Sequence, residues 1–279
     1  MTEPASIPVE AMQMYTEGVE AARLSSGHNQ LEHLRVQELM LRFLPPTPAH
    51  VLDIGGGPGA HALWLAQHGY VVDLLDVVPL HVEQAHAASQ LQTEAPLNSA
   101  VVGDACALPF ATGSADAVLL FGPLYHLTQR TDRLKALSEA HRVLRAGGVL
   151  LAMNVNRFAS TFDGLFGGMY ADPDFVAMAN QDLVDGQHRP PPGKPYFTTT
   201  FFHHPFELRD ELLEAGFAVS ALLGVEGPGW TMRDFDEAWA DPERRGWLLQ
   251  VAQRLEAEVT LLGASAHVMA IATSNPRCI

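Results

Sequence analysis

Cysteine is scarce in this chain, which contains only Cys106 and Cys278 among its 279 residues. Two cysteines that lie far apart and lack metal-ligand spacing predict neither a disulfide framework nor a zinc site, and we expect no metal centre. Long apolar runs are also absent, since none approaches the ~18 residues of a membrane-spanning helix. No basic N-terminal region precedes an apolar run, as it would in a signal peptide. These absences favour a soluble, cytoplasmic protein without a membrane partner.

Positive charge is the second deficiency of the sequence. The chain has 17 Lys and Arg residues against 32 Asp and Glu residues, which gives a formal net charge of −15 at pH 7. An acidic surface repels phosphate backbones, and no cluster of Lys or Arg offsets that repulsion, so we expect no nucleic-acid partner. The hydrophobic content of 47% supports one large packed domain and leaves the oligomeric state open.

The chain does contain a regular alternation of short apolar runs and helical patterns. The apolar runs predict strands at 51–54, 71–76, 100–102, 117–121, 149–154, 217–223 and 266–273. The helical patterns cover 31–44, 59–68, 79–93, 131–146, 205–215 and 247–262, with Asn29 as the expected N-cap of the first. This alternation predicts an α/β fold with a Rossmann-like, doubly wound, seven-stranded and mostly parallel sheet. The ligand of such a sheet lies at the carboxyl ends of its strands.

We expect a single domain built in four parts. Residues 1–48 would form an N-terminal helical cap, and residues 49–155 would form the cofactor-binding core. Residues 156–204 are rich in aromatics and too long for a simple loop in a compact domain, so they predict a lid insertion. Residues 205–279 would complete the core, with a helical insertion near 230–262.

The most informative motif is a glycine-rich turn in residues 51–60, VLDIGGGPGA, between a predicted strand and a predicted helix. Its glycines let the backbone adopt positive φ and approach a ligand closely, and the helix behind them aims its N-terminal amides at that ligand. The turn therefore predicts a nucleotide-type cofactor site. The spacing Gly55-x-Gly57-x-x-Ala60, with Asp76 about 20 residues further on, also satisfies the loose dinucleotide fingerprint. An NAD-dependent oxidoreductase is therefore one alternative.

Two carboxylates weigh against a dinucleotide. Asp53 precedes the first glycine by two residues, where it can meet a cationic ligand group, whereas an anion beside a pyrophosphate is unfavourable. Asp104 follows the third predicted strand within residues 102–110, VGDACALPF, where it can accept a hydrogen bond from an adenine amine or simply form a turn. The chain also ends in two strands separated by a helical insertion, rather than in a second mononucleotide-binding half.

In this combination and order, the motifs resemble those of class I S-adenosylmethionine-dependent methyltransferases, over about residues 45–155 and 205–273. The resemblance implies S-adenosyl-L-methionine as cofactor and a final strand that is antiparallel between its neighbours. It also implies a set of cofactor-binding residues: Asp53, Gly55, Gly56, Gly57 and Gly59 for the methionine part, Asp76 and Val77 for the ribose, Asp104 and Ala105 for the adenine, Phe121 facing the sulfonium, and Tyr15 and Arg23 closing over the cofactor.

Methyl transfer from a sulfonium is an in-line displacement, so holding the nucleophile in line supplies much of the catalysis. A base helps where the nucleophile must lose a proton, by roughly 10²–10⁴-fold. His126 follows the fourth predicted strand and is the leading candidate for a base or orienter, with Tyr125 beside it as a substrate contact. His203, His204 and Trp230 are further candidates for substrate contact, and a helix-start hydrogen bond is the alternative for the two histidines.

We therefore expect a methyltransferase that methylates an O or N atom of a small molecule, such as a natural-product intermediate. Three alternatives stay open at this point: the NAD-dependent oxidoreductase, an RNA methyltransferase, and a non-catalytic scaffold that kept the cofactor fold.

Overall fold

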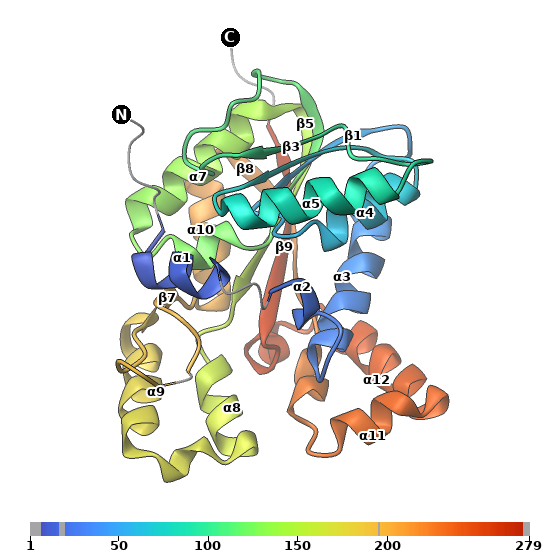
Figure 1. Cartoon of the computed structure of the whole chain (residues 1–279). Coiled ribbons are helices and arrows are strands. Elements are labelled where there is room, and N and C mark those ends of the chain that lie inside the picture. The colour runs from blue at the N-terminus through green and yellow to red at the C-terminus, as the bar shows by residue number, and fades with distance from the viewer. Residues whose placement is uncertain (1–6, 17–19, 195, 276–279) are drawn as a thin grey trace.

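The computed structural model describes residues 7–16, 20–194 and 196–275, and Cys278 lies outside these ranges (Figure 1). Its central feature is a seven-stranded sheet in the order β3-β2-β1-β4-β5-β9-β8. The strands are β1 (His50–Ile54), β2 (Val71–Asp76), β3 (Ser99–Val102), β4 (Ala115–Leu120), β5 (Leu144–Val155), β8 (Phe217–Gly224) and β9 (His267–Ser274). The predicted Rossmann-like sheet is confirmed.

The direction of β9 matters most for the functional site. Strands β1 to β5 pair in parallel with one another, whereas β9 pairs antiparallel with both β5 and β8, as the resemblance implied. Because β9 runs against β5, its first residue, His267, pairs with the last residue of β5, Val155. The start of β9 therefore lies at the edge of the sheet where the parallel strands end.

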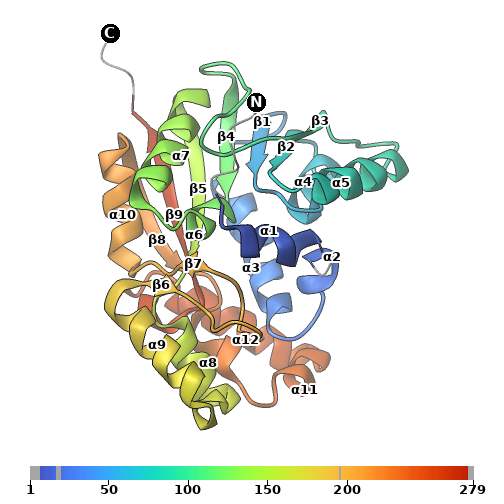
Figure 2. The ribbon, with the colours of Figure 1, turned by 60° about the vertical axis from the view of Figure 1, so that its left-hand side comes forward.

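Helices cover both faces of the sheet (Figure 2). One face carries α3 (Asn29–Phe43), α4 (Ala60–Gln67) and α5 (Pro79–Leu91), and the other carries α6 (Pro123–His126), α7 (Arg130–Val143) and α10 (Pro205–Glu214). Successive strand residues point to opposite faces, so Leu119 belongs to the first hydrophobic cluster and Leu120 to the second. Two covered faces explain why the central strand β4 is apolar at five of its six positions instead of alternating.

The remaining elements gather beyond the carboxyl ends of the parallel strands. Residues 156–204 fold into α8 (Ala159–Gly167), the 3-10 helix η1 (Met169–Ala171), α9 (Pro173–Asp185) and the strand pair β6 (Gln187–His188) and β7 (Thr200–Phe201). A second group of helices also lies beyond these strand ends, opposite α8 and α9. It consists of η2 (Gly227–Thr231), α11 (Phe235–Ala240), α12 (Pro242–Leu255) and η3 (Val259–Ala264). The short helices α1 (Val9–Thr16) and α2 (Glu20–Arg23) cross between these groups and the sheet (Figure 1).

Three local predictions were wrong. Asn29 is the first residue of α3 and not its N-cap, which is His28 and makes no side-chain capping bond. The helix predicted to reach residue 146 ends at Val143, because β5 starts at the next residue and includes the following glycines. The helix predicted over 247–262 starts earlier, at Pro242, since proline suits a first helical position and the Asp241 side chain accepts from the amide of Glu243 at 2.8 Å.

That helix ends at Leu255, and η3 follows it. No helix in the described part of the chain is long and apolar enough to cross a membrane.

Candidate functional site

The glycine turn joins β1 to α4 and is held against the end of β2. Gly55, Gly57 and Gly59 have φ values of 73°, 56° and 91°, in the left-handed region that favours glycine. The amide of Gly55 donates to the carbonyl of Leu75 at 2.7 Å, and the amide of Gly57 donates to the Asp76 carboxylate at 2.8 Å. These bonds fix the turn to the end of β2, and the opposite side of the turn faces a cleft.

Asp53 lies beneath this turn with an unsatisfied charge. It is 2% exposed, and its Oδ2 has no hydrogen-bond partner among the described residues. A Cβ on Gly56 would come within 2.6 Å of that oxygen, so only glycine leaves the carboxylate room. Burial, together with the charge of Asp76, raises the pKa of Asp53 to about 7. A buried carboxylate without a partner is suited to a cationic ligand group.

We define the glycine cleft as the cavity above this turn, and nearly all of the predicted cofactor-binding residues line it. These are Tyr15, Arg23, Asp53, Gly55, Gly56, Gly57, Asp76, Val77, Asp104, Ala105 and Phe121, together with Tyr125 and His126. Gly59 does not line it and instead occupies the N-cap position of α4. The sequence prediction missed four polar residues of the lining: Glu20, Glu32, His61 and His81.

Asp76 and Asp104 combine a structural role with a place in the cleft. Asp76 accepts from the amides of Gly57 and Val78, both at 2.8 Å, and so ties the glycine turn to the start of α5. Asp104 accepts from the amide of Cys106 at 2.8 Å, which is the turn-forming alternative considered for it. Neither contact removes the residue from the cleft lining.

His126 is paired with Tyr15 and is poorly suited to accept a proton. Its Nε2 and the Tyr15 hydroxyl are hydrogen-bonded at 2.8 Å, and its Nδ1 is buried without a partner among the described residues. Burial lowers the pKa of His126 to about 3, although the charge of Asp76 opposes the shift. The arrangement supports the orienting role for His126, through Tyr15, over the role of a base.

A second cavity, of about 290 Å³, adjoins the glycine cleft. We call it the aromatic cavity and define it by six side chains: Tyr125, Phe175, Tyr196, Phe197, Phe202 and Trp230. Tyr15, Arg23 and Tyr125 line both cavities, so the two meet at these residues. Trp230 is fixed there by its indole N–H, which donates to the carbonyl of Ala264 at 3.0 Å.

The structure places His203 and His204 elsewhere, which corrects the expectation that they contact substrate. His203 is fully buried, and its Nε2 lies 3.3 Å from Glu211, which is ion-paired with Arg133. His204 is the N-cap of α10: its Nδ1 accepts from the amide of Phe206, and its own amide donates to Glu207. The helix-start alternative therefore describes His204, and neither histidine lines the glycine cleft or the aromatic cavity.

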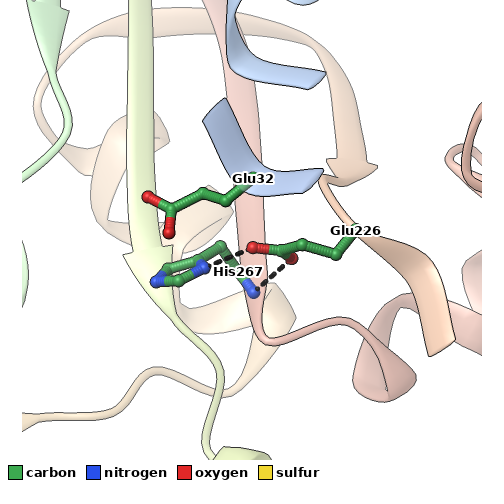
Figure 3. Close-up of side chains that lie close together, drawn as sticks. All are labelled: Glu32, Glu226 and His267. Atoms are coloured by element: carbon green, nitrogen blue, oxygen red, sulfur yellow. Dashed lines mark hydrogen bonds and ion pairs between the residues drawn. The ribbon is translucent and has the colours of Figure 1, made fainter. Parts of the chain in front are cut away.

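At the boundary of the two cavities lies a group of charged residues that the sequence prediction missed, apart from Arg23. Arg23 donates to both carboxylate oxygens of Glu32, at 2.8 and 3.2 Å. Glu32 in turn lies near His267, whose Nδ1–H donates to Glu226 at 2.6 Å (Figure 3). Burial raises the pKa of Glu32, but Arg23 and His267 outweigh it and lower that pKa to about 2.

Glu32, Glu226 and His267 also have the residue types and spacing of a metal site, with one ligand atom from each within 4.8 Å of the others. Their existing contacts compete with an ion, however. Arg23 occupies both oxygens of Glu32, and Glu226 accepts from the Ser265 hydroxyl as well as from His267. Two carboxylates facing one arginine and one imidazole need no ion for charge balance when the imidazole is protonated.

The sequence resembles known proteins over its core. Residues 52–152 match a family model described as a methyltransferase domain. The ubiquinone/menaquinone biosynthesis C-methyltransferase UbiE of Ruegeria sp. is 30% identical over 133 residues, which cover 46% of this chain and 51% of that protein. The O-methyltransferase resE of Aspergillus sclerotiorum is 32% identical over 115 residues, which cover 41% of this chain and 42% of that protein. The chain thus spans about half the length of the curated relatives it matches.

Solved structures extend the likeness to the whole fold. An S-adenosylmethionine-dependent methyltransferase of Methanosarcina mazei has a TM-score of 0.58 at 17% identity, with 85% of this chain and 97% of that chain covered. Another from Mesorhizobium loti also has a TM-score of 0.58, at 15% identity, and covers 87% of this chain and 99% of its own. The matched domain contains the glycine turn, Asp76 and Asp104. Residues 52–152 are thus similar to a methyltransferase domain, and the whole chain has the fold of S-adenosylmethionine-dependent methyltransferases.

Proposed function

We propose that this protein transfers a methyl group from S-adenosylmethionine to a small, largely apolar acceptor bound in the aromatic cavity. The observation that carries the proposal is the junction of the two cavities at Tyr15, Arg23 and Tyr125. An acceptor in the aromatic cavity and a cofactor in the glycine cleft would meet there. Such a junction supplies the positioning on which an in-line displacement depends.

The glycine cleft fits the cofactor's chemistry. The unpartnered Oδ2 of Asp53 suits the ammonium of the methionine part. Arg23 lines the same cleft and is already paired with Glu20 and Glu32. A Cβ on Gly57 would meet only the Glu20 side chain, at 3.8 Å, so the backbone there leaves open space for a ligand. When bound, S-adenosylmethionine supplies a methyl group on a positively charged sulfur. The protein's share is to hold that group in line with the acceptor and to exclude water.

The aromatic cavity indicates the acceptor's character. Aromatic rings and the thioethers of Met169 and Met178 make up much of its lining, as is usual for small-molecule sites. The UbiE relatives are named as C-methyltransferases and resE as an O-methyltransferase, so the relatives' names leave the acceptor atom open. An apolar, ring-containing metabolite, including a natural-product intermediate, is the acceptor class that this lining favours.

Nucleic acid is the less favoured acceptor. A Haloferax volcanii methyltransferase in complex with its Trm112 activator has a TM-score of 0.57 at 14% identity, a likeness of fold alone. The net charge of −15 opposes a phosphate backbone.

A thermal-shift series tests the cofactor assignment. S-adenosylhomocysteine at about 100 times its Kd is expected to stabilise the folded state by about 2.7 kcal/mol, whereas NAD at the same concentration is expected to leave Tm unchanged. Stabilisation by NAD alone would replace the proposal with the oxidoreductase. Binding of S-adenosylhomocysteine without methyl transfer to any of a broad panel of phenols, amines and enolisable ketones would favour the non-catalytic scaffold. Salt-sensitive binding of tRNA or rRNA would revive the RNA methyltransferase.

The pKa of Asp53 predicts that cofactor affinity depends on pH. Because that pKa is about 7, Asp53 is protonated below this value and loses its attraction for an ammonium group. Isothermal titration with S-adenosylhomocysteine should show affinity falling by up to about tenfold per pH unit below pH ~7. The variant Asp53→Asn should bind weakly at every pH, and Asp210→Asn, an exposed control, should behave as wild type. A wild-type affinity that does not change between pH ~5.5 and ~8 would contradict this assignment of Asp53.

A further inference from the structure

His267 lines the aromatic cavity with one ring nitrogen fixed and the other without a partner. We propose that His267 is the general base of the reaction: its Nε2 takes the proton of a hydroxyl acceptor, and Glu226 is the residue that positions its ring. The inference rests on the proposed function and narrows the acceptor to an alcohol or phenol.

Glu226 holds the ring of His267 through Nδ1, and the Glu32 carboxylate lies beside the same ring (Figure 3). Its Nδ1–H donates to Oε1 of Glu226 at 2.6 Å. Glu226 is 2% exposed, and its Oε2 accepts from the Ser265 hydroxyl at 2.8 Å and from the backbone amide of His267 at 3.0 Å. In the neutral imidazole, a carboxylate so restrained fixes the tautomer and leaves Nε2 as the proton acceptor. Nε2 has no hydrogen-bond partner among the described residues.

The location of His267 follows from the antiparallel direction of β9. Its first residue reaches the edge where the parallel strands end, beside the cofactor site. Glu32 lines the glycine cleft and His267 lines the aromatic cavity, yet their ligand atoms lie within 4.8 Å of each other. His267 is thus close to the junction at which the methyl group would be transferred.

The charges around His267 favour its protonated form. Burial lowers the pKa of its imidazole, but Glu226, from the segment after β8, and Glu32, from α3, outweigh burial and raise that pKa above its ordinary value. Arg23, from α2, opposes them more weakly. His28 and Asp163 also line this cavity. An imidazole whose cation is stabilised is the stronger proton acceptor, whereas the pKa of His126 is lowered to about 3.

A third histidine, His188, also has a carboxylate partner. It is excluded as the base because its other ring nitrogen is occupied as well. Its Nδ1 contacts Asp182 at 2.8 Å, and its Nε2 contacts the carbonyl of Tyr196 at 3.3 Å. Both ring nitrogens are therefore in use. His267 is the histidine of the aromatic cavity that combines a fixed carboxylate with a free nitrogen.

The proposed step balances in atoms and charge. The O–CH₃ bond forms as the S–CH₃ bond breaks, and the electron pair of the broken bond returns to sulfur. The hydroxyl proton passes to Nε2 of His267 and then to solvent, so the products are a methyl ether, S-adenosylhomocysteine and a proton. A neutral amine attacks with a lone pair it already has, so its methylation does not need this base.

The test compares matched acceptors. Wild type and the variants His267→Asn, Glu226→Gln and His86→Asn, an exposed control on α5, are assayed on paired phenols and aromatic amines, beginning with 1-naphthol and 1-naphthylamine. We expect His267→Asn to lower kcat for the phenols about 100-fold or more and Glu226→Gln to lower it less, while both bind S-adenosylhomocysteine as wild type does. In wild type, kcat for the phenols should rise with pH through the pKa of His267. His86→Asn should have no effect.

Retained phenol methylation in His267→Asn would overturn the inference, as would wild-type methylation of amines but never of phenols. Activity lost with EDTA and restored by a divalent cation would replace the base with a metal. An NMR titration of the His267 imidazole tests the electrostatic premise independently of any acceptor: its pKa should exceed ~6.5 and fall in Glu226→Gln, and a normal, unchanged value would refute the inference. If no acceptor is methylated, the proposed function is contradicted. The titration of His267 can still be interpreted in that case, because it does not depend on methyl transfer.

Discussion

Replacing Gly57 with alanine will weaken the binding of S-adenosylhomocysteine in addition to destabilising the fold. Gly57 lines the glycine cleft, and a Cβ there would enter open space, with only Glu20 within 4 Å. A methyl group in space that the ligand needs costs about 1–3 kcal/mol, which is roughly a 5- to 150-fold loss of affinity. The φ of 56° adds strain of about 1–2 kcal/mol for a residue with a Cβ. Isothermal titration measures the affinity, and urea denaturation measures the stability.

Gly113 provides the matched control. Its φ is 65°, a Cβ there would meet nothing within 4 Å, and it lines neither cavity. Gly113→Ala should therefore lose a similar amount of stability and bind S-adenosylhomocysteine as wild type does. Equal affinities for the two alanine variants would mean that the ligand does not approach the backbone at Gly57, and would move the cofactor away from the glycine turn.

The sequence was sufficient to predict the sheet because both of its faces are covered. A strand buried on both sides is mostly apolar, so seven short, mostly apolar runs could be assigned as strands. Helix ends were harder to predict, since they depend on whether the backbone continues the helix or pairs with a neighbouring strand. At Leu144 the backbone leaves α7 and pairs with Ala115 of β4. The apolar periodicity of the helix does not predict this switch from helix to strand.

Most of the glycine cleft was predictable because its central residues follow β1, β2, β3 and β4, whose carboxyl ends meet in a parallel sheet. The aromatic cavity was not, because its walls come from α6, α9, η2 and residues 196–202, whose packing depends on long-range contacts. His203 shows the difference. Its position next to a predicted helix suggested substrate contact, yet the residue is buried in the core, where it contacts Glu211 of that helix. His267 was within reach, since an antiparallel final strand beginning at 266 already places its first residues at the functional edge.

The largest loss of stability is expected from Arg133→Met, which removes the centre of a buried ion network. Arg133 is 2% exposed and donates to Glu211 at 2.7 Å. It also donates to the carbonyls of Leu127 and Thr128 and lies 3.8 Å over the ring of Phe201. Methionine fills the space but leaves the buried carboxylate of Glu211 without its cation, which costs about 3–5 kcal/mol. Urea denaturation at neutral pH measures this loss, and Arg209→Met, at an exposed pair, should cost less than about 1 kcal/mol.

The pH dependence of the unfolding free energy distinguishes the loss of a charge pair from the loss of packing in Arg133→Met. Burial raises the pKa of Glu211, but His203 and Arg133 outweigh it and lower that pKa to about 2, from an ordinary value of 4.5. Ionised Glu211 therefore stabilises the fold above pH 4.5, and this contribution is lost as the pH falls towards 2. Without Arg133 that pKa rises, so the difference in unfolding free energy between wild type and Arg133→Met should narrow on acidification. The double variant Arg133→Met/Glu211→Gln should recover part of the loss at neutral pH, because no buried charge is left unpaired. A deficit that is constant with pH and unchanged in the double variant would assign the loss to packing around Phe201 instead.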